Sequence, residues 1–68
     1  MKSVDARGLS CPQPVLLTKQ ALDSDPEGCE VLVDNPAAHA NVTRYAQKAG
    51  YQVAASEENG DILLKIER

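Results

Sequence analysis

Apolar positions in this chain follow a helical period in two segments and a strand period in four. In the first helical segment, apolar or small side chains recur at spacings of three and four, at Pro14, Leu17, Thr18, Ala21 and Leu22. This spacing places them on one stripe of an amphipathic helix that can pack against a sheet. The polar run 23–28 contains a proline and a glycine and then ends the helix.

The second helical segment follows the dipeptide Asn35-Pro36. Asn35 is suited to cap a helix because its side chain accepts a backbone N–H, and Pro36 suits the first turn because it has no N–H to lose. The side chains expected on the buried face are Ala38, Val42, Tyr45, Ala46 and Ala49. Those expected to face solvent are His39, Thr43, Arg44, Gln47 and Lys48. Gly50 lies where a C-terminal cap is expected.

Four short segments alternate between apolar and polar positions, as strands do. They cover residues 2–6, 29–34, 51–57 and 61–67. The dipeptide Arg7-Gly8 interrupts the chain after the first strand, since glycine allows backbone angles that other residues resist. The last two strands are joined through Asn59-Gly60, which is a strong signal for a tight hairpin.

The predicted element order is βαβαββ, and it predicts an α/β (α+β) two-layer sandwich. Right-handed crossovers put both helices on one face of a mixed four-stranded sheet, and the hairpin adds the fourth strand antiparallel. The chain contains no linker or repeat, so we expect one domain over residues 1–68. The uncovered face of the sheet carries Leu32, Ala54, Leu63 and Lys65. It is either a contact with another protein or, as we favour, the ordinary scatter of exposed apolar groups.

The charge balance argues against direct nucleic-acid binding. Seven Lys and Arg residues stand against ten Asp and Glu residues, which gives a formal net charge of −3. The basic excess that phosphate contacts need is missing. The only aromatic side chains are Tyr45 and Tyr51, too few for a platform on which bases stack.

The sequence also argues against a membrane span and a metal site. Its longest apolar runs are three residues, and its N-terminus lacks the apolar core of a signal peptide. We therefore expect a cytoplasmic domain with reduced thiols. Cys11, Cys29 and His39 lie at least ten positions apart, without the close pairs typical of structural zinc sites. No metal or organic cofactor is expected.

Cys11 lies in the segment Ser10-Cys11-Pro12-Gln13-Pro14, where we expect the first helix to begin. Cys11 suits the N-cap because a residue before proline avoids helical backbone angles, and this register makes Pro12 the first helical residue and Pro14 the third. The rival register uses Ser10 as the cap, but it would place Pro14 where its missing N–H removes a helical bond. At the cap, the sulfur would face the helix dipole and the free N–H of Gln13, and both favour the nucleophilic thiolate.

Each candidate residue also has a purely structural interpretation. Cys11 could be a small residue packed at a strand-to-helix turn. Cys29 is expected to point into the core, and a redox pair between the two cysteines stays open without any C-x-x-C spacing to support it. His39 is expected to be a solvated polar residue. Asp5 and Asp34 lie at strand ends near the helix starts, where carboxylates usually cap turns.

The arrangement D-x-x-G-x-x-C-P-x-P, formed by Asp5, Gly8, Cys11, Pro12 and Pro14, resembles the signature of the TusA family of small sulfur carriers. This family includes SirA-like and YedF-like proteins. The resemblance implies a fold similar to the C-terminal domain of translation initiation factor three. Residues 33–36 and 41–51 resemble most closely the YedF-like branch, which is linked to selenium metabolism. Proteins of that branch often have a second domain, so this chain is either a complete carrier or one part of a longer protein.

The resemblance implies that Cys11 carries sulfur as a persulfide, with Asp5, Gly8, Pro12 and Pro14 as structural support. In the family, a cysteine desulfurase loads the cysteine, and an acceptor protein takes the sulfur for tRNA thiolation, molybdenum cofactor assembly or sulfur oxidation. Such a sulfurtransferase-type carrier has no substrate pocket of its own, and whether it counts as an enzyme stays open. We expect the chain to act as a monomer.

Two alternatives use the same fold. In the first, Cys11 carries selenium instead of sulfur, since one thiolate serves both. In the second, the chain is a non-catalytic regulatory module that binds a partner near Arg7, Val15 and Leu16. Val15 and Leu16 lie off the main buried stripe directly after the cysteine, so they form a candidate apolar docking patch for either role.

Overall fold

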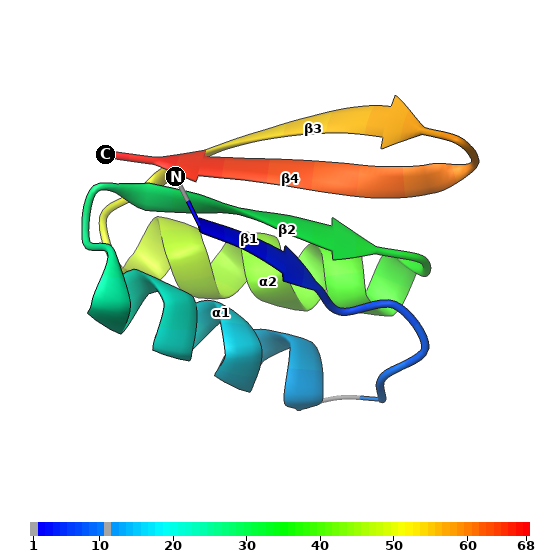
Figure 1. Ribbon diagram of the computed structural model, residues 1–68, viewed down its shortest axis with the longest axis horizontal. Coiled ribbons are helices and arrows are strands. Elements are labelled where there is room, and N and C mark those ends of the chain that lie inside the picture. The colour runs from blue at the N-terminus through cyan, green and yellow to red at the C-terminus, as the bar shows by residue number, and fades with distance from the viewer. Residues whose placement is uncertain (1, 11) are drawn as a thin grey trace.

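A computed structural model describes residues 2–10 and 12–68 of the chain. The elements, in order, are β1 (Lys2–Asp5), α1 (Gln13–Ser24), β2 (Gly28–Val33), α2 (Pro36–Lys48), β3 (Gln52–Glu58) and β4 (Asp61–Glu67). Figure 1 shows a two-layer α+β sandwich in which both helices lie on one side of the sheet. The predicted fold class is confirmed.

The sheet has the strand order β1-β2-β4-β3. β1 pairs with β2 in parallel, with Val4 opposite Val31. β4 pairs antiparallel with both β2 and β3, so the last strand of the chain lies inside the sheet and β3 forms one edge. This order brings the C-terminal end of β2 beside the N-terminal end of β4, where Val33 is opposite Ile62.

The core lies between the sheet and the helices. Its buried side chains are Ala6, Ala21, Leu22, Cys29, Val31, Val33, Ala38, Val42, Ala46, Tyr51, Leu64 and Ile66. Apart from Cys29, the buried inward positions of β2 and β4 are occupied by the aliphatic residues Val31, Val33, Leu64 and Ile66. Burying each such aliphatic side chain contributes about 1.5–3 kcal/mol. Gly28 is required at the start of β2 because an added Cβ would collide with the Ile66 carbonyl of β4. The backbone there also has a positive φ of 151°, which favours glycine.

The helices and strands predicted from the apolar periodicity are confirmed, with small corrections at their boundaries. β3 begins one residue later than expected, and Tyr51 is buried just before it. Ala49 is exposed, contrary to expectation, because α2 ends at Lys48 and the chain turns away at Gly50 with a φ of 93°. The hairpin turn has positive φ at both Asn59 and Gly60, as the sequence predicts.

The open face of the sheet carries the expected residues. Leu32 and Leu63 are paired across β2 and β4 and are half-buried, whereas Ala54 and Lys65 are exposed. In the described part of the chain, no helix is long and apolar enough to cross a membrane.

Candidate functional site

The loop between β1 and α1 carries the motif residues and starts as a continuation of the strand. The backbone N–H of Ala6 donates to the Leu32 carbonyl at 2.9 Å, and the Ala6 side chain is buried. The chain then turns at Gly8, which has a φ of 75°. Leu9 returns toward the molecule and packs against the core. The glycine of the motif therefore serves the backbone turn that the sequence predicts.

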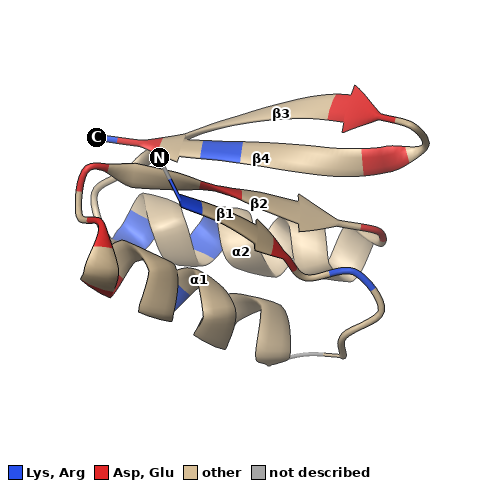
Figure 2. Ribbon diagram, in the orientation of Figure 1, with Lys and Arg blue, Asp and Glu red and all other residues tan. Residues whose placement is uncertain are grey.

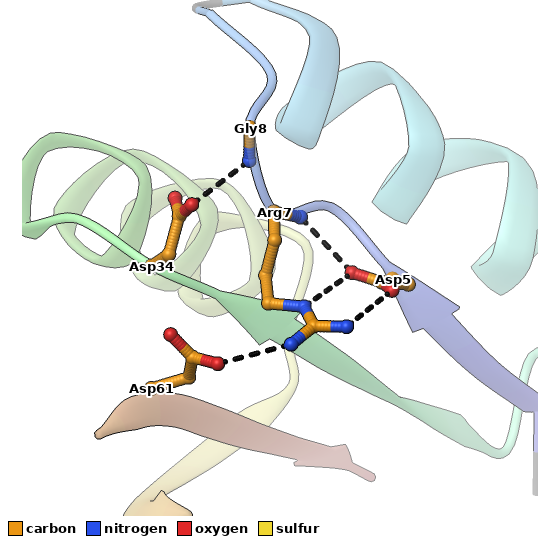
Figure 3. Close-up of polar contacts among 5 residues, drawn as sticks. All are labelled: Asp5, Arg7, Gly8, Asp34 and Asp61. Carbon is orange, nitrogen blue, oxygen red and sulfur yellow. Dashed lines mark hydrogen bonds and ion pairs between the residues drawn. The ribbon is translucent and has the colours of Figure 1, made fainter. Parts of the chain in front are cut away.

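Arg7 is held between carboxylates of two strands (Figure 3). Its Nε and Nη2 donate to the two Asp5 oxygens at 3.0 and 2.9 Å, and its Nη1 donates to Asp61 Oδ2 at 3.1 Å. The Arg7 backbone N–H also donates to Asp5 Oδ1 at 3.1 Å. The hydrogen bonds from the Arg7 side chain and backbone lower the pKa of Asp5 to about 2. Hydrogen bonds to Asp5, which has the larger effect, and to Asp61 raise the pKa of Arg7 above its usual value.

Gly8 is held by a carboxylate from the connection between β2 and α2. Its backbone N–H donates to Asp34 Oδ2 at 2.9 Å (Figure 3). The other Asp34 oxygen accepts from Asn35 Nδ2 at 3.0 Å, and Asn35 Oδ1 in turn accepts from the Ala38 N–H at 2.8 Å, which caps α2 as predicted. The loop after β1 is therefore connected to the start of α2.

The start of α1 differs from the prediction. The helix begins at Gln13 and Pro12 occupies the N-cap, so Pro12 is not the first helical residue and Pro14 is the second instead of the third. Pro12 has a φ of −99° and a ψ of 18°, which is not helical, and its carbonyl accepts the first helical bond from the Leu16 N–H at 3.0 Å. Neither proline needs an N–H in this register, which is why both are tolerated. No side chain caps the helix at this position.

The Gln13 N–H was expected to be free, and this expectation is wrong. It donates to the Ser10 carbonyl at 2.9 Å and closes a turn immediately before the helix. The expectation that Cys11 is the N-cap is wrong, because Pro12 occupies that position. Cys11 itself lies outside the described residues. Its neighbours Ser10 and Pro12 are both exposed. The Gln13 N–H is therefore already bonded within the backbone and is not available to stabilise a thiolate.

The two candidate docking residues on α1 differ in exposure. Leu16 is 45% exposed and is the one large hydrophobic side chain exposed in the described part of the chain. Val15 is half-buried and packs against the core. Leu16 is therefore the stronger candidate for an apolar contact with another protein. Pro14 points inward and is buried.

Cys29 has the surroundings of a structural cysteine. It is a free thiol with no exposed surface, on the inward face of β2. Burial raises the pKa of the Cys29 thiol, and the nearby charges of Asp25 and Glu30 raise it further. These effects keep the thiol protonated and unreactive, as predicted from its alternation along the strand.

The remaining candidates are separate from the loop. His39 is half-buried and lines a hollow of about 430 Å³ on the outer side of α2, beside Thr43 and Arg44. The residues lining this hollow all belong to α2. Across residues 2–10 and 12–68, no group of three or more His, Cys, Asp or Glu side chains could hold a metal ion.

Asp61 was not among the predicted site residues, although its carboxylate accepts a hydrogen bond from Arg7, 54 positions away. It also gave Asp34 no partner in the loop. Figure 2 shows acidic positions, in red, at the ends of β1, β2 and β4 that face this loop. The only sequence signal was the placement of each carboxylate at a strand end, because pairing between them and Arg7 depends on the strand order.

Comparison with known proteins supports the same family as the motif. Residues 2–68 match the sequence model of the family described as Sulfurtransferase TusA. The relatives that bear the name putative sulfur carrier protein include two from archaea. The one from Methanocaldococcus jannaschii is 45% identical over 60 residues, covering 85% of this chain and 80% of its own length. The one from Archaeoglobus fulgidus is 34% identical over 68 residues, covering 97% and 88%.

A solved structure extends the similarity to three dimensions. The crystal structure of a SirA-like protein from Desulfitobacterium hafniense superimposes with a TM-score of 0.89 at 37% identity. The match covers 98% of this chain and 96% of that one. The fold, the loop motif and the matched relatives agree, and the chain belongs to the TusA family of sulfur carriers.

Proposed function

We propose that this protein accepts sulfane sulfur as a persulfide on Cys11 and passes it to an acceptor protein. The observation that carries the proposal is the contrast between its two cysteines. Cys29 is fully buried with a raised thiol pKa, so it cannot meet a partner's sulfur. Cys11 lies in the sequence between the exposed residues Ser10 and Pro12, directly before the N-terminus of α1. It is the cysteine that remains for the carrier role.

The transfer is an exchange at sulfur that needs no oxidant or reductant. The Cys11 thiolate attacks the outer sulfur of a persulfide on the donor enzyme, a new S–S bond forms at Cys11, and the donor's cysteine leaves as a thiolate. The proton of the donor persulfide ends on the new persulfide. Delivery repeats the step in the other direction, with the acceptor's nucleophile attacking the outer sulfur. The chain has to present one sulfur atom to two successive partners.

The expected donor is a cysteine desulfurase, and the expected acceptor is a protein of tRNA thiolation, cofactor sulfuration or a related sulfur pathway. The exposed Leu16 supplies an apolar contact for either partner near the transferred sulfur, since it lies five positions after Cys11 in the sequence. Val15 contributes less because it packs inward. We place the protein in the cytoplasm, because a free thiol such as Cys29 persists in a reducing compartment.

Mass spectrometry after incubation with a cysteine desulfurase and cysteine tests the proposal. We expect Cys11 to gain one sulfur, about 32 Da, and the gain to disappear on treatment with a thiol reductant. Cys11→Ser should abolish the gain, and Cys29→Ser is the matched control that should retain it. An unmodified protein, beside a known carrier loaded in parallel, would overturn the proposal.

The Cys11→Ser variant also separates the carrier from a regulatory module. A carrier loses its cellular function with this change, whereas a module that acts only by binding retains it. Supplying the donor with selenocysteine instead of cysteine tests the selenium alternative at the same residue, because the mass gain then corresponds to selenium.

A further inference from the structure

The segment Arg7-Gly8 is tied to carboxylates that come from the ends of three strands. Asp5 ends β1, Asp34 follows β2 and Asp61 begins β4. These carboxylates receive hydrogen bonds from the Arg7 side chain or the two backbone N–H groups at 2.9–3.1 Å (Figure 3). Cys11 follows Gly8 by three positions. The fold therefore fixes the chain immediately before the motif cysteine from three directions.

Each nitrogen of the Arg7 guanidinium donates one hydrogen bond to a carboxylate. Nε and Nη2 form the two parallel bonds of a bidentate pair with Asp5, and this geometry is available to arginine but not to lysine. Nη1 faces the other way, toward Asp61. A guanidinium held by two carboxylates of its own chain is poorly placed to bind a carboxylate of a partner.

Arg7 and Asp61 lie 54 positions apart in the sequence but are in contact in the fold. It connects the loop after β1 to the first residue of β4, across the end of β2. The Asp61 side chain is only 24% exposed, less than the 47% of Arg7, so this arm of the ion pair is the better shielded one. Exposed ion pairs contribute little to global stability, so its effect is expected on the position of the loop.

We propose that Arg7 is a positioning residue, which together with Asp61 fixes the loop that presents Cys11, and that it is not a docking cation for the donor. The proposal rests on the carrier function proposed above. It differs from the docking role that the sequence suggests for Arg7, and the two roles predict opposite responses to changes at Asp61. Asp61 touches the loop only through Arg7 among the contacts described here.

The experiment compares Arg7→Ala, Arg7→Lys, Asp61→Ala and the double variant Arg7→Ala/Asp61→Ala. Asp23→Ala is the matched control, because it removes an ion pair of the same 3.1 Å length, with Lys19 on α1. Three quantities are measured for each variant. They are the amide hydrogen exchange of Gly8 and Leu9, the rate of Cys11 alkylation by iodoacetamide, and single-turnover sulfur loading as a function of donor concentration.

For a positioning residue, Arg7→Ala and Asp61→Ala each speed exchange at Gly8 and Leu9 and lower the loading rate at saturating donor by about two- to fivefold, the range expected for such pairs. The rate of Cys11 alkylation also changes in both variants, whereas the donor concentration that gives half-maximal loading stays constant. The double variant is no worse than Arg7→Ala alone. Arg7→Lys behaves like Arg7→Ala because lysine cannot form the bidentate pair with Asp5. Asp23→Ala matches the parent protein.

A docking cation gives the opposite pattern. Asp61→Ala then leaves exchange and loading unchanged, Arg7→Lys resembles the parent, and Arg7→Ala raises the donor concentration at half-maximal rate. That result would overturn the proposal. If the parent protein does not load at all while exchange and alkylation respond as described, the carrier function fails and the positioning of the loop by Arg7 stands.

Discussion

The two strand-to-helix connections of this protein are built in different ways. The connection from β2 to α2 is short and capped locally, since Asn35 Oδ1 accepts the Ala38 N–H and Pro36 begins the helix. The connection from β1 to α1 is longer and has no side-chain cap, because Pro12 occupies the N-cap position. It is held instead by carboxylates distant in sequence. The β2–α2 connection is therefore held by its own residues. The β1–α1 connection, which carries the motif cysteine, has no side-chain cap at its helix start and is held by Asp34 and Asp61 from other parts of the chain.

Removing the local cap should give the largest effect on stability. Asn35→Ala removes the acceptor of the Ala38 N–H and should lower the free energy of unfolding by about 1 kcal/mol. The counterpart at the other connection is Ser10→Ala, which removes no side-chain cap and should cost less than about 0.5 kcal/mol. Urea denaturation measures both. Equal losses would show that the first connection also depends on a local side-chain cap.

A smaller effect is expected from the carboxylate that joins the two connections. Asp34→Ala leaves the Gly8 N–H without its partner and should lower the free energy of unfolding by about 0.5–1 kcal/mol, since the bond is exposed to water. Exchange of the Gly8 amide should become faster. Glu57→Ala is the control, because it removes the same charge from an exposed position of β3. If Gly8 exchanges at the parent rate in Asp34→Ala, the bond does not hold the loop.

The smallest effect concerns the pH dependence of the loop. The pKa of Asp5 lies at about 2, below its ordinary value of 3.8, because Arg7 hydrogen-bonds the ionised form. A lowered folded-state pKa stabilises the protein above about pH 3.8, and this contribution is lost as the pH falls from 3.8 to about 2. NMR titration of the Asp5 carboxyl carbon should therefore show a midpoint near pH 2, and near 3.8 in Arg7→Ala. An unshifted midpoint in the parent would mean that the bidentate pair is absent in solution.

Local signals predicted most of the architecture. The apolar stripe of α1, the cap at Asn35 and the turn at Asn59-Gly60 each depend on residues a few positions apart, and all were correctly predicted. The start of α1 was misplaced by one residue because two prolines close together fit either register when only their missing N–H groups are considered. The bond from the Gln13 N–H to Ser10 decides between them, and it involves a turn that no periodicity indicates.

The candidate site was predicted in part. The motif residues Gly8, Pro12 and Pro14 were identified from the sequence, and the inward position of Cys29 followed from strand alternation. The role of Asp61 could not be predicted. It becomes a neighbour of Arg7 only because β4 lies beside β2, and that order leaves no mark in the spacing of apolar residues.

By itself, then, the sequence determined the elements, the side of the sheet that the helices cover and the family. These depend on short-range periodicity, on capping residues and on a compact motif. Tertiary structure alone decided that the last strand is inserted between β2 and β3, and thereby that Asp5, Asp34 and Asp61 converge on one loop. The physical reason is that a hydrogen bond or an ion pair acts over a few ångströms of space, whereas the sequence records distance only along the chain.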